Sequence, residues 1–346
     1  MKRLFEKSHR RLLACVMALV MTILAVGTLV PASVASAGIS ETIKTSEKVW
    51  AIEEIGAVDE VIDADVCVVG GGGVGLAAAI EATQLGLKPV LIEKKAFTGG
   101  SFIGSEGLFA VGSHWQAAAG ETAKVEDFVK SCMEFHHWGV DPSLYQYFFS
   151  RTAQTIEWLE ALGVKFSEVR SIGHSPICWH LYDGNRAEGT GVTFMKRFRN
   201  AADDLSIPIR VNLAGKKLIM KDGKVAGIYA VGSDGKVVQI NAPVVIVGTG
   251  GYADNFDMIR ELNGADTSRI IPGGVSGRDG DGLKMMRDVG AALAEHPGTV
   301  MFYGPITPNT INGSDIQSGT AMQPILWVNQ DGERFCNEGL FWENFS

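Results

Sequence analysis

The regular pattern of hydrophobic and polar positions begins near residue 65. Asp65 to Val69 is a short apolar run rich in β-branched residues, and Lys88 to Glu93 is a second apolar run. Between these two runs, Val74 to Leu85 carries apolar residues at helical spacing. Two short buried strands that flank a helix are typical of a β-α-β unit. The stretch therefore predicts two parallel strands joined by a crossover helix.

A second group of strand-like segments lies downstream, at residues 217–220, 225–231, 236–240 and 244–247. The first three are joined by Lys221-Asp222-Gly223-Lys224 and Gly232-Ser233-Asp234-Gly235, which carry the Asp and Gly residues of tight hairpin turns. They predict a small antiparallel meander, and the fourth predicts a return to the buried sheet. The fold class is therefore α/β, a parallel sheet with an antiparallel meander.

Two helical regions and one irregular stretch complete the pattern. Residues 123–162 and 193–205 have helical spacing. Residues 38–62 are mixed and polar without a strong period, and we interpret them as a lead-in after which the fold starts.

The first 37 residues have the pattern of a targeting segment. Five basic residues precede an uncharged run from Leu12 to Val30, and Ala35-Ser36-Ala37 is a small-residue cleavage signal. We expect a signal peptide over 1–37 and export to the periplasm or cell envelope. An apolar run of this length can also span a bilayer, so membrane anchoring by residues 12–30 is the alternative.

Composition and charge narrow the classes of function. A hydrophobic share of 46% with 20% charged residues is ordinary for a folded protein. The net charge is -8 and no basic run follows the N-terminus, which argues against a nucleic-acid partner. The five cysteines form no C-x-x-C motif, so we expect no metal site and interpret the thiols of the folded part as free and buried.

The turn after the first strand carries the main candidate site. Residues 70–75 read G-G-G-G-V-G, which satisfies G-x-G-x-x-G between a strand and a helix. Gly70 permits the tight turn, Gly72 lets the backbone approach a pyrophosphate, and Gly75 lets the helix pack on the strand. The helix N-terminus favours the anion, and Glu93 at the end of the second strand suits a ribose hydroxyl. The motif predicts a dinucleotide site and leaves NAD and FAD open.

Five further blocks follow along the chain. They read E-K at 93–94, T-G-G-S at 98–101, V-I-V-G-T-G-G-Y-A-D-N at 245–255, G-D-G at 280–282 and D-G-E-R-F-C-N-E at 331–338. In this order they resemble the FAD-binding domain of the fumarate reductase and succinate dehydrogenase flavoproteins. This resemblance implies that FAD is the cofactor. It adds to the glycine turn and Glu93 the candidate contacts Gly73, Lys94, Gly99, Gly100, Ser101, Gly107, Thr249, Gly250, Gly251 and Asp281.

The resemblance also implies a domain organisation. A Rossmann-like FAD-binding domain occupies 63–252, an inserted and partial capping domain occupies 253–317, and 318–346 returns to the first domain. Family members continue past the R-F-x-N-E block with another lobe, whereas this sequence stops at Ser346. We expect a truncated gene or a partial sequence.

The chain departs from the family where the substrate is held. The resemblance implies a His, a Glu and Arg pair, and a proton-donating Arg, which together clamp a dicarboxylate. Aligned without gaps, these positions hold Phe302, Ser318, Ala321 and Trp342. His296 lies about six residues too early for the family His, and we interpret it as a loop or helix-end residue. None of the four aligned side chains can clamp a carboxylate, because that task needs Arg or another cationic donor.

The altered positions favour a flat or aromatic, largely uncharged acceptor of enone or phenolic type. Tyr303 beside Phe302 is then the candidate catalytic proton donor, and its alternative role is a core aromatic residue. The leading hypothesis is an exported FAD-dependent reductase of an activated C=C bond in a small organic electron acceptor. A separate electron-donor protein, a cytochrome or a membrane quinol oxidase, would supply its electrons. The alternatives are a flavin dehydrogenase of the 3-ketosteroid type and a non-catalytic FAD-binding remnant.

The leader generates the first prediction. If the segment is cleaved after Ala37, the protein purified from its native host begins at Gly38, which N-terminal sequencing detects. An intact Met1 in the membrane fraction would support the anchor, and an intact Met1 in the cytoplasm would contradict export.

Overall fold

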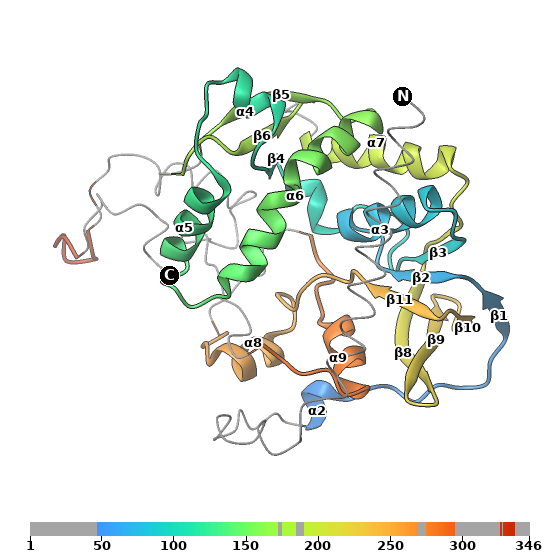
Figure 1. The fold of residues 1–346 in the computed structure, drawn as a ribbon. Helices are drawn as coiled ribbons and strands as arrows, with labels where there is room; N and C mark the ends of the chain where they lie inside the picture. The colour runs from blue at the N-terminus through green and yellow to red at the C-terminus, as the bar shows by residue number, and fades with distance from the viewer. Residues whose placement is uncertain are drawn as a thin grey trace, which may run out of the picture. The chain divides into compact units, whose positions relative to one another are not determined.

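A computed structural model describes residues 47–171, 175–184, 190–268, 275–294, 326 and 328–335. Their central element is a parallel sheet of four strands in the order β11-β2-β3-β7. Strands β11, β2 and β3 of this sheet are labelled in Figure 1. The strands are β2 (Val66–Val69), β3 (Pro89–Ile92), β7 (Ile209–Arg210) and β11 (Val244–Val247). Every residue of β2 and β3 is buried, as their continuous apolar runs predict for a parallel sheet. The predicted α/β class is confirmed.

The side chains of the central strands alternate between two hydrophobic cores. Val68 and Leu91 face helices α3 (Gly73–Gln84) and α7 (Thr190–Asp204), and they share a core cluster with residues of both helices. The side chain of Val69 points to the opposite face of the sheet, where it packs in a second cluster with residues of the meander. This alternation follows from the period of two along a strand, so each strand contributes side chains to both core clusters.

The meander is present as predicted and gains a strand from upstream. Its strands are β8 (Leu213–Lys221), β9 (Lys224–Gly232) and β10 (Val237–Asn241). Asp222 and Gly223 both have positive φ, 52° and 72°, as the favoured two-residue hairpin turn requires. The strand β1 (Glu60–Asp63) pairs with β10 in parallel.

The expectation that the fold starts after residue 62 is therefore wrong. Besides β1, helix α2 (Glu47–Trp50) contributes Trp50, whose indole N–H donates to Glu261 Oε1 at 2.6 Å. The guanidinium carbon of Arg287 lies 4.3 Å from the centre of the Trp50 ring. A short polar strand and a single tryptophan leave no periodic pattern, which explains why sequence analysis assigned this stretch to a lead-in.

A third sheet, which the sequence pattern did not predict, orders β4 (Gly107–Phe109), β6 (Trp179–Tyr182) and β5 (Phe166–Arg170) antiparallel. The helical region predicted at 123–162 is two helices, α5 (Val125–Phe135) and α6 (Pro142–Ala161), which lie side by side (Figure 1). His137 and Trp138 take positive φ between them, and the Asp141 side chain caps α6 by accepting from the Ser143 N–H at 2.8 Å.

Two further helices lie C-terminal to the parallel sheet, α8 (Phe256–Asn263) and α9 (Asp281–Asp288). Met285 of α9 is buried in the cluster shared with the meander. The domain boundaries proposed at 252 and 317 remain predictions. In the described part of the chain, no helix has the length and apolarity to cross a membrane.

The cysteines of the described part, Cys67, Cys132 and Cys178, are free thiols. Burial raises the pKa of both Cys67 and Cys178 to about 12. Such thiols stay protonated and unreactive. The interpretation of free buried thiols is confirmed for Cys67 and Cys178, whereas Cys132 is half-buried.

A buried polar network joins the third sheet to helix α4 (His114–Ala118). His180 is fully buried, and its Nδ1 lies 2.9 Å from the Cys178 carbonyl oxygen. Because a carbonyl can only accept, Nδ1 carries the proton, and Nε2 accepts from the Ser113 hydroxyl at 2.6 Å. Burial, the largest influence, lowers the pKa of His180 below its ordinary value of 6.5. The folded state therefore favours the neutral form of the His180 imidazole.

The second prediction concerns pH. Since the pKa is lower in the folded chain, the contribution of His180 to stability is complete above pH 6.5 and is lost as the pH falls through the folded pKa. His180→Gln should lower the free energy of unfolding by about 1 to 3 kcal/mol near neutral pH. It should also flatten the fall in stability between about pH 7 and pH 5. Denaturant unfolding at a series of pH values measures both, with the exposed His137→Asn as control. Parallel pH curves for wild type and His180→Gln would contradict this role.

Candidate functional site

The turn between β2 and α3, whose two elements are labelled in Figure 1, adopts the conformation that its glycines predict. Gly70 has φ +105°, and a Cβ there would lie 2.5 Å from the Gly248 carbonyl oxygen. A Cβ on Gly75 would lie only 1.7 Å from the Gly70 carbonyl oxygen. The first and third glycines are thus required by the packing of the chain itself.

Gly72 differs, because its Cβ would meet nothing closer than 3.9 Å. A Cβ on the second glycine would therefore clash with no part of the described chain, so the packing of the protein does not itself require glycine at this position. Gly72 is also the N-cap of α3, with no side-chain cap and no acidic residue in the first turn. The first bond of the helix is from the Leu76 N–H to the Gly72 carbonyl, at 3.0 Å. The N–H groups before Leu76 lie at the positive end of the helix dipole, where an anion is stabilised.

Glu93 lies beside this turn, as predicted. The residue is 9% exposed; its Oε2 accepts from the Gly71 N–H at 2.6 Å and its Oε1 from the Lys95 N–H at 2.8 Å. Each carboxylate oxygen has a second lone pair, so both can still accept from ribose hydroxyls. The two backbone bonds fix the orientation of the acid before any ligand arrives.

The second glycine block lies against the first. Gly99 forms an isolated parallel bridge with Gly72, and its N–H donates to the Gly71 carbonyl at 2.8 Å. Gly99 and Gly100 both have positive φ, 145° and 54°, and Gly100 begins the 3-10 helix η1 (Gly100–Gly104). These dihedral angles explain why both positions hold glycine, since residues with a Cβ rarely adopt them.

An aromatic residue holds η1 in place. The Phe102 ring packs 4.8 Å from Phe194 and 6.1 Å from Tyr182, centre to centre. Ser101 of the same helix is exposed beside it. The loop that carries the candidate contacts Gly99, Gly100 and Ser101 is therefore anchored by packing against α7 and β6.

A third loop, residues 248–251, follows β11. Together with the glycine loops at 70–75 and 98–101 it forms a cradle of three loops. The Gly248 N–H donates to the Val69 carbonyl at 2.8 Å, at the end of β2. Gly250 has φ +78°, and both Gly250 and Gly251 are exposed. The carboxyl ends of β2, β3 and β11 thus meet at one edge of the parallel sheet, where ligands bind in open α/β folds.

The G-D-G block lies directly on this third loop. The Gly280 N–H donates to the Gly251 carbonyl at 3.1 Å, and a Cβ on Gly282 would lie 2.3 Å from Thr249 Oγ1. Asp281 lies between them, and its carboxylate binds Lys94 Nζ at 2.8 Å. The predicted residues Lys94, Thr249 and Asp281 are therefore brought together with the cradle, although the two charged side chains engage each other.

Gly107 has a different explanation. It lies in β4, where a Cβ would come 2.4 Å from the His180 carbonyl oxygen of the neighbouring strand. The sheet itself requires glycine there, and a cofactor role for Gly107 stays a prediction. Tyr303, the candidate proton donor, lies outside the described residues, as do His296, Phe302, Ser318, Ala321 and Trp342.

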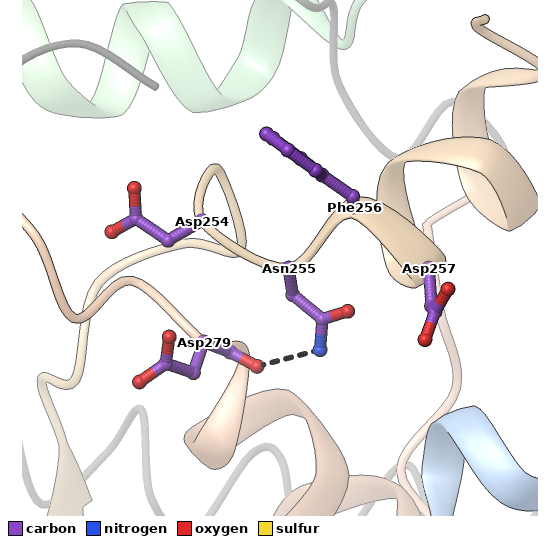
Figure 2. Close-up of a pocket in the computed structure, with 5 residues that line it drawn as sticks. All are labelled: Asp254, Asn255, Phe256, Asp257 and Asp279. Atoms are coloured by element: carbon purple, nitrogen blue, oxygen red, sulfur yellow. Dashed lines mark hydrogen bonds between the residues drawn. The ribbon is translucent and has the colours of Figure 1, made fainter. Parts of the chain in front are cut away.

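A pocket at the start of α8, which the sequence did not indicate, is lined by Asp254, Asn255, Phe256, Asp257 and Asp279 (Figure 2). The Asn255 side chain donates to the Asp279 carbonyl at 3.0 Å and accepts from the Met258 N–H at 3.1 Å. With three carboxylates in its wall, this pocket does not suit a diphosphate. The glycine cradle remains the candidate site.

Comparison with known proteins agrees with this geometry. Residues 65–346 match the family model described as FAD binding domain. A vinyl phenol reductase of Lactiplantibacillus plantarum is 33% identical over 289 residues, which are 82% of this chain and 58% of that protein. The solved structure of a flavocytochrome c3 fumarate reductase in its open conformation is similar with a TM-score of 0.67. Its sequence identity is 25%, and the match covers 83% of this chain and 50% of that one.

The fold also occurs in a 3-ketosteroid-Δ4-(5α)-dehydrogenase of Rhodococcus jostii RHA1, with a TM-score of 0.68 and 23% identity. That match covers 83% of this chain and 63% of the dehydrogenase. The chain spans about half the length of the curated relatives it matches.

This chain belongs to the FAD-binding domain family, and the choice between NAD and FAD that the glycine motif left open falls on FAD. The resemblance to fumarate reductase flavoproteins is confirmed. The residues of the cradle fit that cofactor: the uncapped N-terminus of α3 suits the diphosphate, Gly72 presents its backbone without a side chain, and Glu93 suits the adenosine ribose.

The third prediction separates the fold from the ligand at two glycines. Gly72→Ala adds a Cβ that meets Gly99 and Gly100 only at an ordinary van der Waals distance of 3.9 Å, so it should change the stability of the FAD-free chain by no more than about 1 kcal/mol. It should nevertheless reduce FAD retention, because the methyl group occupies the approach of the diphosphate. Gly75→Ala should instead destabilise the FAD-free chain, by about 1 to 3 kcal/mol. Flavin absorbance per protein and thermal unfolding of the FAD-free form distinguish the two. Normal FAD retention in Gly72→Ala would remove Gly72 from the site.

Proposed function

We propose that this chain is the FAD-binding part of an oxidoreductase that reduces the activated C=C bond of a small, largely uncharged organic acceptor. The observation that carries the proposal is the cradle of three glycine loops at the carboxyl edge of the parallel sheet, with Glu93 bonded in place beside it. Bound FAD supplies hydride transfer to an activated double bond. The protein contributes orientation, exclusion of water and a proton.

The acceptor class is inferred from charge at the clamp positions. Phe302, Ser318, Ala321 and Trp342 cannot make the charge-assisted bonds that hold a dicarboxylate, each of which is worth about 1.5 to 3 kcal/mol. The similarity to a vinyl phenol reductase, a protein named for a neutral aromatic acceptor, supports the same class. We propose a planar conjugated acceptor of phenolic or enone type, with Tyr303 as proton donor.

A flavin dehydrogenase of 3-ketosteroid type is the second candidate. The similarity to a 3-ketosteroid dehydrogenase, solved in complex with 4-androstene-3,17-dione, extends to the fold. The two candidates differ in the direction of electron flow: a reductase passes electrons from reduced FAD to the acceptor, whereas a dehydrogenase reduces its FAD with the steroid. A third candidate is a remnant that binds FAD without catalysis.

The electron source and the location are also part of the proposal. The described residues contain no haem-binding motif, so a separate donor protein, a cytochrome or a membrane quinol oxidase, would reduce the FAD. Export to the cell envelope, proposed from residues 1–37, would bring the chain to such a donor.

The fourth prediction tests the acceptor class. The FAD-loaded protein, or a form extended past Ser346 if one is encoded, is reduced anaerobically and mixed by stopped flow with fumarate, a vinyl phenol and a 3-ketosteroid enone. Loss of several charge-assisted bonds should weaken fumarate binding by several orders of magnitude, so fumarate should not reoxidise the flavin. The neutral conjugated acceptors should reoxidise it.

Variants complete this test. Tyr303→Phe should slow reoxidation by about 10²-fold or more if Tyr303 donates the proton, with binding of the acceptor unchanged. The exposed Glu157→Ala in α6 is the matched control.

Fast reoxidation by fumarate would contradict the proposed acceptor class. Reduction of oxidised flavin by a saturated steroid, without reoxidation by any acceptor, would favour the dehydrogenase. FAD binding with neither reaction would favour the remnant.

A further inference from the structure

Two consecutive lysines at the end of β3 both reach the segment Ser276–Gly282. Lys94 Nζ lies 2.7 Å from Asp279 Oδ2 and 2.8 Å from Asp281 Oδ2. Lys95 Nζ donates to the Ser276 carbonyl oxygen. These contacts join positions about 185 residues apart in the chain, at the edge of the sheet where the cradle lies.

The same segment rests on the third loop of the cradle. The Gly280 N–H donates to the Gly251 carbonyl, and Gly282 packs on Thr249 without room for a Cβ. Gly280 has φ +76°, which lets the backbone bend between the two aspartates and turn both toward Lys94. The position of the aspartate turn and that of the 248–251 loop are therefore linked.

Charge makes this arrangement depend on Lys94. Two carboxylates bind one ammonium group, whose side chain is 28% exposed. Burial opposes its charge, yet the hydrogen bonds that Lys94 donates to Asp279 and Asp281 prevail and raise the pKa of Lys94. Neighbouring Asp254 has its own partner, the guanidinium of Arg278, at 2.9 Å. Without the Lys94 ammonium, the carboxylates of Asp279 and Asp281 would lie close together and repel each other.

We propose that Lys94 is a positioning residue of the cofactor site, which acts by neutralising Asp279 and Asp281 and so holding their turn against the Thr249–Gly251 loop. The inference rests on the proposed binding of FAD in the cradle. A diphosphate carries negative charge, so two uncompensated carboxylates beside the cradle would repel it as well as each other. Lys94 thus affects FAD affinity through its acidic partners.

The test measures the FAD dissociation constant by flavin fluorescence on protein stripped of cofactor. Lys94→Met keeps the length of the side chain and removes the charge; we expect its dissociation constant to rise by about tenfold or more. Lys94→Arg keeps the charge and should remain within about threefold of wild type. Lys88→Met removes a lysine charge at the opposite end of β3 and should leave the dissociation constant unchanged.

A charge-reducing second substitution distinguishes neutralisation from simple loss of structure. Asp279→Asn added to Lys94→Met should recover a large part of the lost affinity, because one of the two repelling charges is gone. Raised salt should narrow the gap between Lys94→Met and wild type, since screening weakens the repulsion. Thermal unfolding of the FAD-free forms reports general damage to the fold.

The outcomes separate this inference from the function beneath it. A wild-type chain that takes up no FAD would overturn the proposed function, and this inference with it. A wild-type chain that binds FAD while Lys94→Met binds it equally well would overturn the inference alone. The same holds if the affinity lost in Lys94→Met is recovered neither by Asp279→Asn nor by salt.

Discussion

The close approach of Gly75 to the Gly70 carbonyl is the constraint on which the rest of the site depends. It lets α3 start directly at the end of β2, so the helix dipole points at the edge of the sheet. Because Gly70 also packs against Gly248, the same turn aligns the loop after β11 with the helix N-terminus. A larger residue at either glycine would move the helix, the loop and the anion site together. The geometry of the cradle is thus a property of backbone contacts.

Sequence reasoning succeeded where local pattern and fold agree. Three kinds of segment determine their own conformation locally. They are the continuous apolar runs of β2, β3 and β11, the Asp-Gly and Ser-Asp-Gly turns of the meander, and the glycine motif. The candidate cofactor residues around Gly70–Gly75, Glu93, Gly99–Gly100 and Thr249–Gly251 lie together as the ordered blocks predicted. In such elements a few neighbouring residues determine the conformation.

It failed where the reason for a structure lies far away in the chain. Strand β5 has a largely exposed pattern and is a strand because it pairs with β6, while β1 is short and polar and depends on β10. The structural role of Trp50 depends on its contacts with Glu261 and Arg287, and that of Lys94 on its contacts with Asp279 and Asp281. No period or spacing signals a contact between residues about 185 to 240 positions apart. For Lys94 the available signal was chemical: the acidic R-D-G-D-G segment needed a cation.

A chain with a net charge of -8 that binds an anionic cofactor must solve an electrostatic problem locally. The acidic groups near the cradle are each bonded to a donor: Glu93 to two backbone N–H groups, Asp254 to Arg278, and Asp279 and Asp281 to Lys94. Lys94 and Lys95 are bonded to two of these acids and to a carbonyl oxygen, so within the part of the chain that the structure describes the backbone N–H groups at the start of α3 supply the attraction for the diphosphate. Backbone dipoles are fixed in direction and need no counter-ion. The site can therefore favour a diphosphate that the chain as a whole repels, but only where a glycine lets the ligand approach the backbone.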